Sequence, residues 1–232
     1  MMNKIEDTDE LTVIRQKAEA GDAEAQYDMG VCCLCGEGIQ QDTEKAFDWF
    51  LRAAEQGYIQ AQTDVGWCYE YGKGVAEDAE KAAEWYLRAA EAGLPEAQFR
   101  IGCCCANGNG VAQDAEKAVE WYIKAAEVGC TDAQNNLGCC YFNGFGVAKN
   151  YTKASKWLRK AAEQGNEQAK DNLECFEEDE KRRISECPAH EWVSSGGSQE
   201  TSGDSLAILF FVDYECKHCG AVKSELDNVH YL

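Results

Sequence analysis

The chain has 232 residues, 45% of them hydrophobic, and 42 acidic against 22 basic residues give a formal net charge of −20. The hydrophobic content predicts a folded protein, whereas the negative charge argues against nucleic-acid or anionic-lipid binding, because phosphate recognition needs clusters of Lys and Arg. We expect most of this charge to lie on solvated helix faces rather than in a patch dedicated to a basic partner.

Neither a secretion signal nor a membrane span is expected. The first ten residues are acidic and lack an apolar core. No run approaches the roughly 18 apolar residues that a span requires. These features predict a cytoplasmic protein.

A motif that recurs every 36 residues organises most of the chain. Each copy begins with Gly and ends with Ala-Gln, as in 21–26, 57–62, 93–98 and 129–134. A period of this length is typical of a stack of identical supersecondary units. We therefore predict a leading capping helix in 1–20, four repeats in 21–164, a capping helix and linker in 165–186, and a separate module in 187–232.

Each repeat is predicted to contain two helices, A and B, joined by a turn. Two glycines two positions apart supply the positive φ that ends helix A and turns the chain, first at Gly36 and Gly38. Asp22 and Asn166 are suitable N-caps of helix A, and one column of side chains is suited to cap helix B. That column is Asp42, Asp78, Asp114 and Asn150.

A glycine also recurs in the middle of helix A, where it costs about 1 kcal/mol relative to Ala. The glycines are Gly30, Gly66, Gly102 and Gly138. We expect each to accommodate a bulky indole from helix B, which would let the two helices approach closely. The indoles are Trp49, Trp85, Trp121 and Trp157.

Together these columns, which end in Lys-Ala-x2-Trp-x3-Ala-Ala, resemble the Sel1-like repeat, a relative of the tetratricopeptide repeat. The resemblance covers about 11–176. It implies an all-α, right-handed αα superhelix whose helices A line a concave surface. It also implies an adaptor that holds protein complexes together.

The cysteines form a column of their own at Cys32, Cys68, Cys104 and Cys140. Packed helices lie about 8–10 Å apart, whereas a disulfide needs Cα atoms within about 7 Å. We therefore expect these residues to act as small buried hydrophobes, and a metal or redox site in the repeats is not expected.

Function should depend on the positions of helix A that vary between repeats. Residues spaced by four lie on one helix face, which we expect to be the concave surface. Aromatic residues there favour a protein or peptide partner. The predicted partner-binding residues are Trp67, Tyr71, Phe99 and Phe142. Packing between repeats remains an equally weighted alternative for them.

The C-terminal module contains two pairs of potential metal ligands. Cys187 and His190 form the first pair, and Cys216 and Cys219 the second. Two such pairs are typical of a structural zinc site with four ligands and no open position. The segment resembles a zinc ribbon with strands at 190–193 and 206–214, a flexible loop at 194–204, and a third strand possible at 221–226.

The sequence thus predicts a non-catalytic adaptor with a structural Zn²⁺ site. Two alternatives stay open. One is a hydrolase, because some Sel1-like proteins have been linked to β-lactams, although no nucleophile here lies beside a plausible base. The other is nucleic-acid binding through the ribbon, which the net charge opposes.

Overall fold

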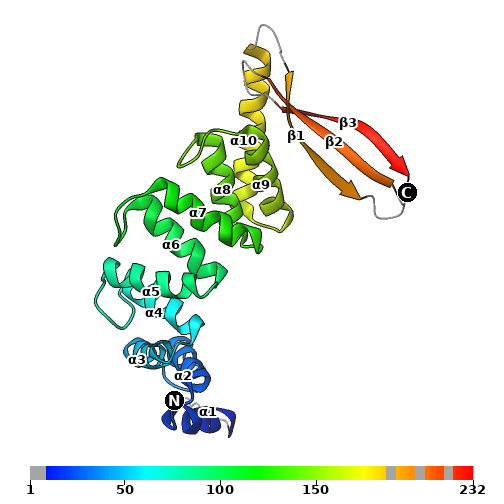
Figure 1. Ribbon diagram of the computed structural model, residues 1–232. Coiled ribbons are helices and arrows are strands. Elements are labelled where there is room, and N and C mark those ends of the chain that lie inside the picture. Colours follow the sequence, from blue (N-terminus) through cyan, green and yellow to red (C-terminus); the bar gives the residue numbers. More distant parts are fainter. Residues whose placement is uncertain (1–8, 187–191, 202–206, 217–221, 232) are drawn as a thin grey trace, which may run out of the picture. The chain divides into compact units, whose positions relative to one another are not determined.

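The computed structural model describes residues 9–186, 192–201, 207–216 and 222–231 (Figure 1). It divides into two units, Met1–Cys130 and Thr131–Leu232. The described part of the first unit is helical: α1 (Asp9–Glu19), α2 (Ala23–Cys35), α3 (Thr43–Glu55), α4 (Ile59–Tyr71), α5 (Ala79–Glu91), α6 (Pro95–Asn107) and α7 (Ala115–Glu127). The second contains α8 (Thr131–Asn143), α9 (Tyr151–Glu163), α10 (Glu167–Glu186), β1 (Trp192–Thr201), β2 (Ala207–Cys216) and β3 (Val222–Tyr231).

The helices pack in sequential pairs, as the repeat predicts. Helix A and helix B of the successive repeats are α2 with α3, α4 with α5, α6 with α7, and α8 with α9. Within the first unit, α1 precedes the first pair and buries Leu11 and Ala18 against the hydrophobic core. No helix in the described ranges is long and apolar enough to cross a membrane.

Helix boundaries follow the capping residues expected from the sequence. The side chain of each predicted cap of helix B accepts a hydrogen bond from the backbone N–H three residues later. Asp22 and Asn166 do the same for Ala25 and Ala169, both at 2.8 Å. These bonds satisfy amides that would otherwise lack a partner in the first helical turn. The N-cap predictions are confirmed.

The glycine in the middle of helix A marks a close contact, but its predicted partner was wrong. A Cβ at Gly66 would lie 2.7 Å from the ring of Tyr86, and a Cβ at Gly102 would lie 2.7 Å from that of Tyr122. In each repeat the residue that fills this space is the one directly after the predicted Trp: Phe50, Tyr86, Tyr122 and Leu158. One helical position turns a side chain by about 100°, so the indole points elsewhere.

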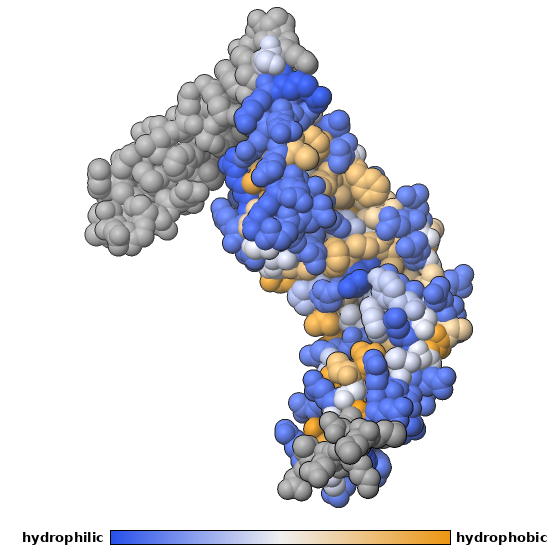
Figure 2. Space-filling model, turned by 180° about the vertical axis from the view of Figure 1, so that it is seen from behind, coloured by the Kyte–Doolittle hydropathy of each residue, from blue (hydrophilic) through white to orange (hydrophobic). Residues whose placement is uncertain are grey.

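The indoles are half-buried instead, and each lies under a basic side chain three residues later. The cation-to-centroid distances are 4.7 Å for Arg52 on Trp49 and 3.8 Å for Lys124 on Trp121. The equivalent pairs in the other repeats are Arg88 on Trp85 and Lys160 on Trp157. Hydrophilic side chains dominate the surface seen in Figure 2, with separate hydrophobic patches between them.

Helix α10 closes the helical part of the second unit. Phe176 is only 2% exposed and joins a small core with Leu158 and Ala154 of α9. Asn172 Nδ2 donates a hydrogen bond of 2.8 Å to Asn135 Oδ1 of α8. The guanidinium of Arg183 lies 3.7 Å from the ring centroid of Tyr151.

Strands β1, β2 and β3 form an antiparallel sheet in that order. The expected flexible loop at 194–204 is wrong for 194–201, because these residues belong to β1. The register shifts between Ser194 and Gly196, so the glycines coincide with a bulge, a position that tolerates Gly within a strand.

Candidate functional site

The varying positions of helix A become more exposed from the start of the helix to its end. Tyr27 of α2 is half-buried, and its ring lies 5.6 Å from Phe50 and 5.0 Å from Tyr58. Phe99 of α6 is also half-buried, 6.1 Å from Tyr122. Near these helix starts the varying residues therefore contribute to packing.

Toward the end of α4 the same face is open. Tyr71 is 46% exposed, and its ring lies 5.8 Å from that of the half-buried Trp67. Both rings stand on one face of the helix because they are four residues apart. Trp67 also packs against the core of the first unit. This pair is the most accessible aromatic part of the predicted face.

Phe142, the fourth predicted partner-binding residue, occupies a different environment. Its ring packs edge-on against Tyr151 at 5.8 Å and Phe176 at 5.6 Å, within the second unit. These contacts support the packing alternative for Phe142, because the ring helps α10 to cover the fourth repeat.

Sequence reasoning missed a set of carboxylates on the same helices. Asp28 of α2 and Asp64 of α4 occupy equivalent positions, each half-buried. Asp64 accepts a hydrogen bond from the Tyr27 hydroxyl. Burial raises the pKa of Asp64, and the nearby Glu96 raises it further. Their recurrence at one repeat position was the signal that could have found them.

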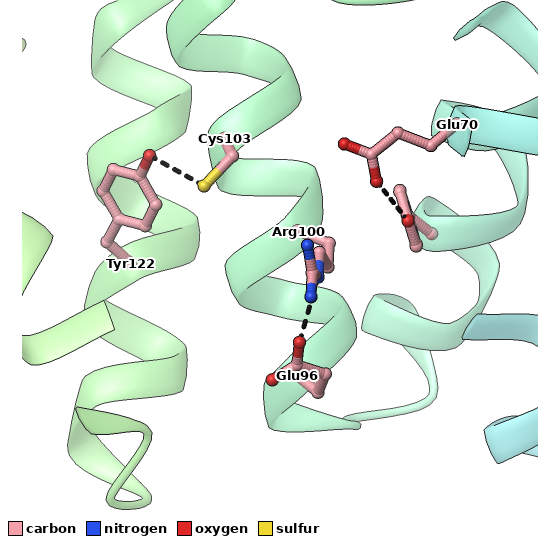
Figure 3. A network of polar contacts seen from close by, with 6 residues as sticks. Glu70, Glu96, Arg100, Cys103 and Tyr122 are labelled. Carbon is pink, nitrogen blue, oxygen red and sulfur yellow. Dashed lines mark hydrogen bonds and ion pairs between the residues drawn. The ribbon is translucent and has the colours of Figure 1, made fainter. Parts of the chain in front are cut away.

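The polar contacts continue across α4 and α6 (Figure 3). The Tyr86 hydroxyl donates a hydrogen bond of 2.6 Å to Glu70 Oε2. Arg100 Nε donates one of 3.0 Å to Glu96 Oε1. The Tyr122 hydroxyl lies 3.4 Å from Cys103 Sγ. The two tyrosines that fill glycine spaces, Tyr86 and Tyr122, thus extend their hydroxyls to side chains of helices A.

The charges on α2, α4 and α6 are strongly unbalanced. These helices contain one basic residue, Arg100. Their five carboxylates are Glu24, Asp28, Asp64, Glu70 and Glu96. Burial raises the pKa of Asp28, and the charges of Glu24 and Asp22 raise it further. Neighbouring carboxylates raise one another's pKa in this way when too few cations lie near them to neutralise their charge. We refer to the exposed side of α2, α4 and α6 that carries these carboxylates, Trp67 and Tyr71 as the helix-A face.

Buried thiols of the repeats stay protonated at neutral pH. Burial raises the pKa of Cys68 to about 12 and that of Cys104 to about 12. Cys68, Cys104 and Cys140 of the predicted column are buried as expected, whereas Cys32 is only half-buried. Cys32, Cys68 and Cys104 are not in disulfides. A protonated thiol is a poor nucleophile and a poor metal ligand, so these residues act mainly by filling space.

The predicted zinc ligands Cys187, His190 and Cys219 lie outside the described residues. Cys216 ends β2, and its backbone pairs with Trp192 at the beginning of β1. No group of three potential metal ligands occurs among the residues whose side chains are described, a range that does not include the predicted site.

Comparison with known proteins identifies the chain's family. The Sel1 repeat matches residues 23–58, 59–94, 95–130 and 131–166, a frame that begins at the first residue of α2. These matches cover more than half of the chain, which therefore belongs to the Sel1 repeat proteins. No curated protein sequence matches it.

Two of the solved structures that share this fold illustrate the similarity. The first is c5321, described as a protective antigen of uropathogenic Escherichia coli strains with an SLR fold, at 42% identity and a TM-score of 0.68 over 70% of this chain. The second is a Sel1 repeat protein from Oxalobacter formigenes, at 35% identity and a TM-score of 0.66 over 69% of this chain. The match spans 35% of the first protein and 64% of the second.

Proposed function

We propose that the chain is a non-catalytic scaffold that binds a protein or peptide on the helix-A face. The observation that carries this proposal is the Trp67–Tyr71 pair, in which Trp67 is half-buried and Tyr71 is exposed. Its rings stand at the open end of α4, and Tyr71 remains 46% exposed. Aromatic side chains with a polar rim are typical of protein interfaces.

The hydrolase alternative finds less support in the repeats. Burial raises the pKa of the Cys103 and Cys139 thiols as well, whereas a nucleophilic cysteine requires a lowered pKa. The scaffold proposal needs only an accessible face on a rigid array, which the family's fold supplies.

Affinity capture with purified chain tests the scaffold proposal. Tyr71→Ala should remove specific binding partners, because truncation of an exposed aromatic anchor at an interface costs about 2 kcal/mol of binding free energy. Leu87→Ala is the matched control, since Leu87 is an exposed apolar residue of α5, a helix B. A partner set that Tyr71→Ala leaves unchanged would overturn the proposal.

We further propose that Cys187, His190, Cys216 and Cys219 bind one structural Zn²⁺. The antiparallel register supports this ligand set, because the end at which β1 begins is also the end at which β2 finishes. Three thiolates and one imidazole fill the tetrahedral coordination that structural zinc prefers. Such an ion would add folding free energy to a small sheet.

Metal analysis of the purified chain tests the zinc proposal. One zinc per chain is expected, with loss of the metal in Cys216→Ala/Cys219→Ala. The double variant Cys32→Ala/Cys68→Ala, in the repeats, should keep the zinc. A wild-type chain purified without chelators that contains no zinc would contradict the proposal.

A further inference from the structure

The charge of the helix-A face distinguishes it from the helices B of the same unit. Each of α3, α5 and α7 carries two basic residues among three acidic ones. One of these bases in each helix pairs with the capping Asp, as Lys81 does with Asp78 at 2.8 Å. On the helix-A face Arg100 alone faces five carboxylates, and it is bound to Glu96 at 3.0 Å.

These carboxylates are close enough to influence one another. Burial and the charge of Glu24 raise the pKa of Asp28. Burial and the charge of Glu96 raise the pKa of Asp64. The charge of Glu70 also raises the pKa of Cys103 on α6 and that of Tyr86 on α5. The negative potential therefore extends over α2, α4 and α6 and is not confined to one turn of one helix.

Helix α4 also carries aromatic rings and a buried hydroxyl near these carboxylates. The Trp67–Tyr71 pair stands on α4, the helix that also carries Asp64 and Glu70. One turn before Trp67, the Thr63 hydroxyl is buried and lacks a hydrogen-bond partner among the described residues. The face thus offers aromatic contact and negative charge, and an unsatisfied polar atom lies buried one helical turn from the aromatic pair.

We infer that the partner segment that binds the helix-A face carries Lys or Arg side chains alternating with apolar ones. This inference rests on the proposed function and adds the chemistry of the partner. Apolar side chains of the segment would contact Trp67 and Tyr71, and its cations would offset the charges of Asp64 and Glu70. Opposite charges across an interface favour fast and specific association.

Fluorescence anisotropy with defined peptides tests the inference. The probes are labelled peptides of repeated Leu-Lys-Ser, Leu-Glu-Ser and Gly-Lys-Ser triplets. The Leu-Lys-Ser peptide should bind at least about tenfold more tightly than either of the others, and its affinity should fall with added salt. Equal affinities for the Lys and Glu peptides would overturn the inference.

Charge variants separate a specific face from general attraction to an acidic protein. Asp64→Asn/Glu70→Gln keeps the acceptors for Tyr27 and Tyr86 and should weaken Leu-Lys-Ser binding about threefold to tenfold. Arg100→Gln should strengthen it. Glu84→Gln/Glu120→Gln removes two exposed charges from helices B and should leave it unchanged; an equal loss in this control would overturn the inference.

The two proposals fail in different ways. If the Leu-Glu-Ser peptide binds best and Tyr71→Ala abolishes that binding, the face is retained and the cationic partner is wrong. If Tyr71→Ala alters the affinity of none of the peptides that bind, the binding face itself is wrong. Circular dichroism of each variant checks that the repeats remain folded.

Discussion

Single side chains determine how closely the two helices of a repeat approach. At Gly102 an added Cβ would lie 2.7 and 2.8 Å from two ring atoms of Tyr122. Gly102→Ala should therefore lower the free energy of unfolding by about 1–3 kcal/mol through overpacking, despite the better helix propensity of Ala. Urea denaturation measures this loss.

A double-mutant cycle identifies the residue responsible. The cost of Gly102→Ala should largely disappear in a Tyr122→Ala background and persist in a Trp121→Ala background. The reverse pattern would restore the indole as the partner of the glycine.

A second residue-scale prediction concerns a hydrogen bond that the first and fourth repeats make and that the third repeat lacks. Gln56 Nε2 donates to Gln26 Oε1 at 2.7 Å, and Gln164 Nε2 to Gln134 Oε1 at 2.8 Å. The equivalent donor position for Gln98 is Val128, which is 65% exposed, and Gln98 Oε1 is buried without a partner among the described atoms.

Val128→Gln should supply this missing donor. We expect the free energy of unfolding to rise by about 1 kcal/mol, the usual net value of one hydrogen bond. Val128→Ala controls for loss of the exposed valine. No gain of Val128→Gln over Val128→Ala in urea denaturation would contradict the assigned hydrogen bond.

At the scale of the element, the caps of helix B couple stability to pH. Hydrogen bonds from the Lys81 side chain and backbone lower the pKa of Asp78, and the equivalent lysines do the same for Asp42 and Asp114. Because the folded pKa is depressed, this stabilisation is complete above the unfolded value of about 3.9. It is lost as the pH falls through the folded pKa.

The fourth repeat shows that Asn can replace Asp at this position, since Asn150 caps α9 without a titrating group. In Asp42→Asn/Asp78→Asn/Asp114→Asn, the fall in melting temperature below about pH 4 should be shallower than in wild type. Thermal unfolding followed by circular dichroism at several pH values measures both slopes. Parallel slopes would show that other carboxylates dominate the acid response.

At the scale of the whole molecule, features that recur with the 36-residue period were predicted better than features that depend on residues outside it. The caps and turns were predictable because Asp42 and Gly36 act on their own backbone, and such local effects recur with the period. The side chain that packs against Gly66 could not be predicted, because Trp85 and Tyr86 occupy adjacent positions of the same repeat. Only three-dimensional packing shows that Tyr86 makes the contact.

The candidate site was likewise predictable only in part. Tyr71 was predictable as an exposed aromatic at a varying position, whereas the contacts of Phe142 depend on α10, which follows the last complete repeat. The carboxylates were visible as charge in the sequence, but their accumulation on the helix-A face became apparent only from the contacts of Asp64 and Glu70.

Site-specific photo-cross-linking tests most directly whether partners bind the helix-A face. A benzophenone amino acid replaces Tyr71 in one sample and Leu87, on a helix B, in another, and the chain is irradiated with the Leu-Lys-Ser peptide. We predict a covalent adduct at position 71 and little or none at position 87. Equal adducts at both positions, or an adduct only at position 87, would contradict the assignment.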